Sequence, residues 1–225
     1  MLKLTYLSHS AFILDDGHYK VAVDPFITGN PTCPVKAEDV NPDFIVLTHA
    51  HGDHFGDTIK LAKKKDSLVI AVNELANYVA SQGIKAHNMH IGGSYGFPFG
   101  SVKFTIAHHG SAFNDGSYMG NPAGVIIKMG GKCIYHAGDT GLFMDMQLIG
   151  QQNKIDAALL PIGDNFTMGI DNAVIASDFV KCDKIIGMHY DTVDEIKIDS
   201  KEAKLKFEHS GKELFLLSVG ETREI

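Results

Sequence analysis

The pattern of hydrophobic and polar residues along the chain predicts a series of short strands, several of them followed by helices. One continuous apolar run, at residues 44–48, is typical of a strand that is buried on both faces. The acidic turn at residues 15–17 ends in glycine and predicts a hairpin between two of the strands. Strands are expected at residues 2–7, 11–14, 20–23, 44–48, 67–72, 102–107, 124–128, 132–136, 157–160, 184–187 and 213–219.

Apolar residues recur at helical spacing in several segments between these strands. Asp199 is followed by Glu202 three residues later, which resembles a capping box and predicts the start of a helix. Three consecutive lysines at residues 63–65 fall where another helix should end, a position where the helix dipole favours positive charge. Helices are expected at residues 57–65, 74–82, 143–149, 171–180 and 199–209. This strand and helix content repeats loosely in the two halves of the chain.

Polar clusters directly follow four of the apolar strands. The first is the stretch T-H-A-H-G-D-H at residues 48–54, which crowds three histidines and an aspartate into six positions. His109, Asp139 and His189 follow three later strands. In proteins whose sheets are covered by helices, functional groups collect on loops at strand ends. We therefore expect these four clusters to come together in one site.

The length and composition are those of an ordinary soluble globular protein. Hydrophobic residues make up 44% of the chain and charged residues 21%. The 225 residues suit one large domain or two tightly fused halves. We expect a single domain over residues 1–225, with a boundary between two similar halves near residue 120.

Charge and hydropathy limit the expected partners. The formal net charge of −7 repels phosphate backbones, so nucleic acid is not an expected partner. No apolar stretch reaches 18 residues and the N-terminus lacks the apolar core of a signal peptide, so we expect no membrane association. Cys33, Cys133 and Cys182 lie far apart and are expected to be reduced thiols in a cytoplasmic protein. A small-molecule substrate is expected. A homo-oligomer is possible, since the sequence does not determine the oligomeric state.

The histidine-rich clusters predict a metal site. Neutral imidazole and carboxylate suit Zn²⁺, Mn²⁺ or Fe²⁺, and two such ions about 3.5–4 Å apart share a bridging carboxylate. A single histidine at a strand end is more often a hydrogen-bonded structural residue, but four ligand-type groups in six positions would be costly to bury without compensation. His108 is adjacent to His109 and is an alternative ligand. The candidate ligands are His49, His51, Asp53, His54, His109, Asp139 and His189.

The same residues resemble the metallo-β-lactamase superfamily. Residues 49–54 match its H-x-H-x-D-H signature, and the spacing of the later His, Asp and His matches as well. Over nearly its whole length the chain is similar to the UPF0173 family of metal-dependent hydrolases, which is related to ascorbate-6-phosphate lactonase. The supporting segments are Y-L-S-H-S at residues 6–10, I-Y-H-A-G-D-T at 134–140, L-P-I-G-D-N-F-T-M at 160–168 and G-M-H-Y at 187–190.

The resemblance implies a four-layer αββα sandwich, an α/β (α+β) fold, with two metals at one edge between the sheets. It implies that the first metal is held by His49, His51 and His109, the second by Asp53, His54 and His189, and that Asp139 bridges them. One departure concerns Gly110, because the family more often has His-Ser-Ser where this chain has His-Gly-Ser. Because of that difference, the resemblance does not determine how this position contacts the substrate.

The expected reaction is hydrolysis of a small ester, lactone or phosphoester. Two divalent metals lower the pKa of a bridging water from about 15.7 towards 7, which provides a hydroxide nucleophile. No serine or cysteine nucleophile motif appears in the chain. Asp53, a ligand beside the bridge, is the candidate catalytic residue that orients this water and later carries a proton to the leaving group.

Three polar residues are candidates for contact with the substrate. Asn165 and Thr167 lie in a polar segment at residues 163–168, which follows a strand at the expected edge of the site. An ordinary loop packed by its apolar residues is the alternative. His9, at the end of the first strand, is the third candidate, and it could instead orient a metal ligand.

Other functions compete with the hydrolase. A non-catalytic metal-binding or sensing domain remains open. A diiron oxidoreductase on this scaffold is less favoured, because that class prefers a carboxylate where His51 stands and usually joins a flavin domain. A nuclease is disfavoured by the acidic charge, and a secreted β-lactamase by the missing signal peptide.

Overall fold

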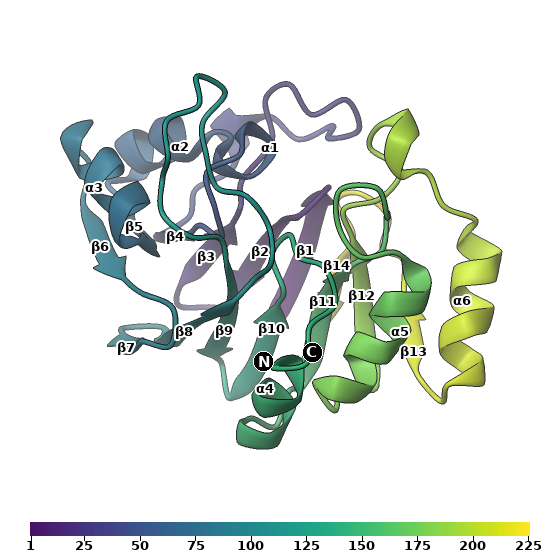
Figure 1. Ribbon diagram of the computed structural model, residues 1–225. Helices are drawn as coiled ribbons and strands as arrows, with labels where there is room; N and C mark the ends of the chain where they lie inside the picture. Colours follow the sequence, from purple (N-terminus) through teal and green to yellow (C-terminus); the bar gives the residue numbers. More distant parts are fainter.

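The structure is a computed structural model that describes all 225 residues, and it contains two mixed sheets of seven strands each, packed face to face (Figure 1). The first sheet has the spatial order β14 (Thr222–Glu224), β1 (Lys3–Ser8), β2 (Ala11–Asp15), β3 (Lys20–Val23), β4 (Phe44–Val46), β5 (Leu68–Val72), β6 (Ala86–Met89). The second has the order β13 (Glu213–Phe215), β12 (Lys184–Met188), β11 (Ala157–Pro161), β10 (Lys132–His136), β9 (Ala123–Met129), β8 (Gly100–Ile106), β7 (Ser94–Phe97).

Helices cover the outer faces of both sheets. On the first sheet, α2 (Thr58–Lys65) and α3 (Asn73–Ser81) pack beside β4, β5 and β6 (Figure 1). On the second, α5 (Ile170–Phe179) packs against β11, α6 (Ser200–His209) against β13, and α4 (Met146–Gln152) against α5. Short elements complete the chain: α1 (Gly52–Phe55), η1 (Ala37–Asp39) and η2 (Asp194–Ile196). The expected four-layer αββα sandwich, an α/β fold, is confirmed.

Each sheet is antiparallel in one part and parallel in the other. β3, β4, β5 and β6 run parallel, as do β10, β11, β12 and β13. Parallel strands that are covered on both faces read as continuous apolar runs, and the central strands of these sheets follow this rule. All five residues of β11 are buried, and so are all three of β4. The residues that follow β3, β4, β10, β11 and β12 therefore start from rigid positions at one end of the molecule.

One core extends through both sheets. A single cluster of 61 buried hydrophobic residues joins them, so the two sheets share one interior. Full burial of a leucine such as Leu4 or Leu160 stabilises the fold by about 1.5–3 kcal/mol each. The shared core fixes the loops of one sheet relative to those of the other.

Several elements differ from the sequence-based expectations. β6, β7, β14 and α1 were not indicated by the pattern, because β7 is an exposed edge strand in a glycine-rich segment and α1 is one turn long. The prediction of a closing strand at residues 213–219 is wrong beyond Phe215, where β13 ends. The predicted helix start at 143 is also wrong: α4 begins at Met146. Phe143 lies before the helix, where its ring centre is 5.0 Å from that of His108.

The chain passes from the first sheet to the second between Met89 and Ser94, and only β14 returns to the first sheet. The expected boundary between two similar halves near residue 120 stays a prediction, since sheet membership does not measure the similarity of the halves. None of the helices has both the length and the apolar character that crossing a membrane requires.

Candidate metal centre

The histidine-rich stretch at residues 48–54 is held in place by one buried aspartate, Asp24, at the end of β3. The Thr48 backbone N–H donates to Asp24 Oδ1 at 2.8 Å, and the Thr48 hydroxyl donates to Oδ2 at 2.5 Å. His54 Nδ1–H donates to the same Oδ2 at 2.8 Å. Because Nδ1 of His54 is committed to Asp24, its Nε2 is the nitrogen that faces the interior of the site.

Asp139 lies at the centre of the histidines. Its Oδ2 is 3.1 Å from His189 Nε2 and 3.2 Å from His54 Nε2. The same oxygen is 3.5 Å from His109 Nε2 and 4.0 Å from His49 Nε2. One carboxylate oxygen is therefore surrounded by four imidazole nitrogens that come from segments following three different strands, β4, β8 and β12.

The turn that places Asp139 requires a glycine directly before it. Gly138 has φ +63°, and a Cβ there would lie 2.6 Å from the Ala123 carbonyl oxygen and 3.2 Å from Thr48 Cβ. The chain thus passes between β9 and the stretch that carries the first three histidines, where no side chain fits. This close approach brings Asp139 of the second sheet to the histidines of the first.

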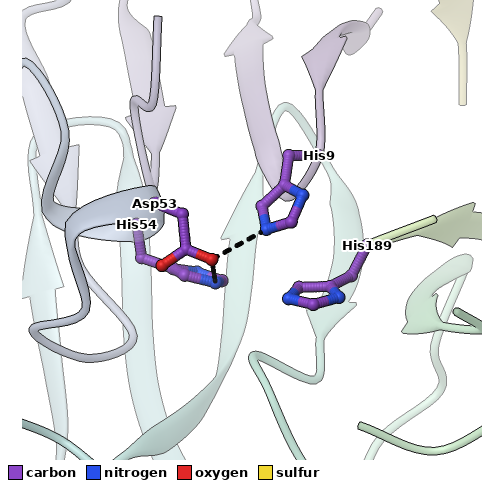
Figure 2. A group of neighbouring side chains, drawn as sticks. All are labelled: His9, Asp53, His54 and His189. Atoms are coloured by element: carbon purple, nitrogen blue, oxygen red, sulfur yellow. Dashed lines mark hydrogen bonds and ion pairs between the residues drawn. The ribbon is translucent and has the colours of Figure 1, made fainter. Parts of the chain in front are cut away.

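The candidate ligand atoms form three groups in which all atoms lie within 4.8 Å of one another. The first group is His49, His51 and His109. The second is His9, Asp53, His54 and His189, shown in Figure 2. The third joins Asp24 to His49 and His54. The structure therefore brings together all seven side chains that were expected to hold metal, and it adds His9.

The ring of His9 links the two sheets and has both nitrogens engaged. Its Nε2 is 3.0 Å from Asp53 Oδ2 (Figure 2). Its Nδ1 is 2.8 Å from Thr192 Oγ1. Its carbonyl oxygen accepts a 2.9 Å hydrogen bond from the His189 N–H. His9 also has φ +57°, a left-handed conformation that costs energy in a residue other than glycine and often occurs at functional sites. His9 therefore orients Asp53.

Burial and charge shift the pKa values of these groups. Burial and the neighbouring His54 hold the pKa of His49 well below its usual value. Burial acts the same way on His54, but the nearby Asp139 and Asp24 outweigh it and raise its pKa well above the usual value. Burial would raise the pKa of Asp139, yet His54 and His189 hold it well below its ordinary range. The carboxylate is therefore ionised and ready to act as a ligand.

Asp53 is the most exposed carboxylate of the cluster, with a side chain 41% exposed. Burial would raise its pKa, but the hydrogen bond from His9 and the nearby His54 lower it below the ordinary value. Asp53 is therefore ionised, and solvent can reach its carboxylate.

Unpaired buried atoms indicate that the cluster fits metal ions. His54 Nε2, Asp139 Oδ1 and His189 Nδ1 are buried without a hydrogen-bond partner. His49 Nε2 and His51 Nδ1 face each other at 3.0 Å. Leaving so many buried polar atoms unpaired is costly, and a divalent cation would satisfy several of them at once. Nitrogen and carboxylate donors of this kind suit Zn²⁺, Mn²⁺ or Fe²⁺.

Other predicted residues lie outside the cluster. His108 does not face it, since its ring packs on Phe143. Thr167 donates its hydroxyl to the Met168 carbonyl oxygen at 3.3 Å, and Asn165 is exposed. Direct contact of Asn165 and Thr167 with substrate stays a prediction. His136 is buried between the sheets, where its Nε2 lies 3.0 Å from the Ser10 carbonyl oxygen, so it is a structural residue.

Sequence reasoning missed two residues that support the ligands. Asp24 follows the apolar strand β3 directly, so the rule that identified the other polar clusters at strand ends also applies to it. Thr192 is an isolated threonine three residues after His189, and only its contact with His9 reveals it.

Gly110 packs against His51. A Cβ at this position would lie 3.5 Å from His51 Nε2, an ordinary van der Waals contact. A serine here, as the family more often has, would therefore fit without displacing the imidazole. The glycine leaves the outer edge of His51 uncovered.

Comparisons with known proteins agree with this fold and site. The family model of the β-lactamase superfamily domain matches residues 19–190. A UPF0173 metal-dependent hydrolase from Christiangramia forsetii is 50% identical over the full length of both chains. Igni18, described as a novel metallo hydrolase from the hyperthermophilic archaeon Ignicoccus hospitalis, is 36% identical, with a TM-score of 0.91 over 100% of this chain and 99% of its own.

A more distant structure shares the fold. The isothiocyanate hydrolase from Delia radicum gut bacteria has a TM-score of 0.79 at 23% identity, and the alignment covers 99% of this chain and 98% of that one. The fold and the cluster of histidine and aspartate side chains thus define a metal-dependent hydrolase of the β-lactamase superfamily. Within that superfamily, the chain belongs to the UPF0173 family of metal-dependent hydrolases.

Proposed function

We propose that the seven side chains hold two divalent cations and that the site hydrolyses a small ester, lactone or phosphoester. The observation that carries this proposal is the position of Asp139, whose Oδ2 lies 3.1–4.0 Å from the Nε2 atoms of four histidines. One set of donors consists of His49, His51 and His109. Asp53, His54 and His189 form the other, and Asp139 bridges the two sets.

The chain's own residues have distinct tasks in this proposal. The two cations, when bound, supply an activated water and polarise the oxygen of the bond that is cleaved. Asp24 fixes the ring of His54, and Thr192 together with His9 fixes Asp53. Asp53 is half-exposed beside the cluster, so it orients the attacking water and transfers a proton to the leaving group.

Metal analysis tests the ligand set. The purified protein, reloaded with Zn²⁺ or Mn²⁺ and desalted, is expected to contain close to two ions per chain by mass spectrometry of the metals. His109→Ala is expected to lose at least one ion. His108→Ala is the matched control, because this neighbouring histidine packs on Phe143 and should leave both ions in place. Equal metal content in both variants would contradict the assignment of His109.

Turnover tests the reaction. We expect the Zn²⁺- or Mn²⁺-loaded protein to hydrolyse at least one member of a panel of p-nitrophenyl esters, lactones, bis(p-nitrophenyl) phosphate and an isothiocyanate. Asp53→Asn is expected to lower kcat by about 10²-fold or more while retaining metal, because a general acid–base group contributes about that much. Full turnover of Asp53→Asn with both metals bound would exclude its proton-transfer role.

The same experiments decide between the alternatives. A protein that holds two ions and turns over no substrate of the panel would favour a metal-binding or sensing domain. An iron pair that changes oxidation state reversibly would favour the diiron oxidoreductase. Neither alternative is supported by a specific feature of the site.

A further inference from the structure

The loops around the metal centre contain almost no positive charge. They follow the strands at the end of the molecule that lies at the top of Figure 1, and they comprise residues 24–36, 47–57, 107–122, 137–145, 162–169 and 189–199. Of the 20 lysines and arginines in the chain, only Lys36 and Lys197 lie in these loops. Lys197 is paired with Asp194 at 2.6 Å, and Lys36 is exposed directly before η1.

The single arginine is also committed elsewhere. Arg223 lies on β14, where its guanidinium stacks 3.6 Å from the centre of the Phe215 ring. Enzymes that recognise a phosphate or carboxylate away from the reacting bond commonly pair it with arginine or lysine. Apart from the exposed Lys36 and the paired Lys197, these loops contain no lysine or arginine that could act as such a partner.

Half-buried and exposed apolar side chains occur in these loops instead, and one of them contacts a residue of the cluster. The Phe26 ring packs against His9, with 5.9 Å between ring centres, and it is half-buried. Val193 is 44% exposed and follows Thr192, the residue that contacts the His9 ring. Phe166 is 54% exposed and lies two residues before Met168, whose N–H donates to the carbonyl oxygen of Thr140, next to Asp139.

We propose that the substrate is uncharged and apolar beyond the bond that is cleaved, so that the site accepts neutral esters or lactones and excludes phosphorylated or carboxylated ones. This inference rests on the proposed function, because it concerns the part of the substrate that extends from the metals. The cations, when bound, would contact the reacting group. An anion further out would enter loops with almost no positive charge and would lose its hydration without gaining a partner.

Binding of three hydroxamic acids to the metal-loaded protein tests the inference without requiring turnover. Acetohydroxamic acid, hexanohydroxamic acid and adipic acid monohydroxamate share the same metal-binding head group. The second adds a hydrocarbon chain, and the third ends that chain in a carboxylate. By calorimetry, we expect the hexano compound to bind about tenfold more tightly than the aceto compound, because its chain covers apolar surface. The adipic compound should bind no more tightly than the aceto compound.

Two matched variants locate the preference. Phe166→Lys adds a cation to the loop after β11 that is hydrogen-bonded through the Met168 N–H to Thr140, next to Asp139, and is expected to improve binding of the adipic compound by about fivefold relative to the hexano compound. Leu148→Lys is the control, because Leu148 is 50% exposed on α4, at the bottom of Figure 1, and should not change the ratio.

The outcomes separate this inference from the proposed function. Tighter binding of the adipic than of the hexano compound, or equal binding of the aceto and hexano compounds, would overturn the inference alone. An unchanged ratio in Phe166→Lys would overturn it as well. If the expected binding order appears but no ester, lactone or phosphoester is hydrolysed, the hydrolytic function fails and the binding preference stands. A protein that retains no metal would overturn both.

Discussion

At the residue scale, the site depends on buried groups outside the seven proposed ligands. Asp24 is the clearest case, since one carboxylate accepts hydrogen bonds from the Thr48 N–H, the Thr48 hydroxyl and the His54 ring. Such partners fix the orientation of a ligand and raise its basicity, so their loss commonly lowers metal affinity by about 10–100-fold. The positions of His54 and of the loop around it therefore follow from one side chain.

Asp24→Asn is expected to weaken metal binding by about 10–100-fold, because an asparagine keeps only one acceptor oxygen and its –NH₂ group cannot accept from Thr48 or His54. Competition with a chromophoric zinc chelator measures the affinity. Asp156→Asn is the matched control, since Asp156 also accepts a 2.8 Å hydrogen bond from a backbone N–H, that of Cys133, at the other end of β10. Similar affinities in the two variants would show that Asp24 does not support the metal ligands.

Thr192 is expected to determine which nitrogen of His9 carries the proton. Burial holds the pKa of His9 below its usual value, so the ring is neutral. For its Nε2–H to donate to Asp53, the Thr192 hydroxyl must donate its single proton to Nδ1 at 2.8 Å and not to the Tyr190 carbonyl oxygen at 3.3 Å. Thr192→Val removes this donor, and we expect kcat to fall by about tenfold with both metals retained. Thr192→Ser, which keeps the hydroxyl, should restore activity; a serine variant as impaired as the valine variant would argue against this role.

At the scale of elements, the site is assembled where strand ends meet. β3, β4, β10 and β12 supply Asp24, the His49 loop, Asp139 and His189 from rigid, buried strands. The connections leave little free space, as the turn between β10 and Asp139 shows. The position of Asp139 in the metal centre therefore depends on the backbone geometry of this turn.

Gly138→Ala is expected to destabilise the protein by about 2–4 kcal/mol, because the added Cβ combines left-handed strain with a 2.6 Å contact to the Ala123 carbonyl oxygen. Urea denaturation of the metal-free protein measures the free energy of unfolding. Gly131→Ala is the matched control: Gly131 also has a positive φ, +76°, but nothing lies within 4 Å of its Cβ position. Its cost should be about 1 kcal/mol. Equal losses would mean that close packing at Gly138 is unimportant.

At the scale of the whole molecule, the shared core buries many ionisable groups at the junction of the two sheets. Burial lowers the pKa values of His9, His49, His51, His109 and His136 from their usual value. Only His54 has its pKa raised, by Asp139 and Asp24 against the effect of burial. The folded, metal-free protein therefore resists protonation of most of its buried histidines.

This balance predicts a loss of stability in mild acid. Below about pH 6.5 the unfolded chain takes up protons that the folded chain excludes, so stability falls as the pH decreases, by up to about 1.4 kcal/mol per pH unit for each such histidine. His54 acts in the opposite sense but is a single group. We expect the Tm of the metal-free protein to fall by several degrees between pH 7.5 and 5.5. A constant or rising Tm over this range would contradict the neutral state of these histidines.

The sequence by itself determined the chemistry of the site and most of the framework that carries it. Four ligand-type groups in six positions after a buried strand indicate metal in any fold, because local spacing already brings them together. Strands such as β11 and helices such as α6 follow from apolar periodicity and from the Asp199 cap, whose side chain accepts from the N–H groups of Lys201 and Glu202. These features depend on residues that are close in the chain.

Only the tertiary structure decided which distant side chains meet. His108 and His109 are equivalent as sequence, and packing of His108 on Phe143 turns only His109 toward Asp139. The link from Thr192 through His9 to Asp53 joins three segments, and the short edge strands β7 and β14 acquire their role only from their neighbours in the sheets. Such contacts depend on how the two sheets pack through one core. Local sequence patterns carry no information about which residues far apart in the chain lie close together in space.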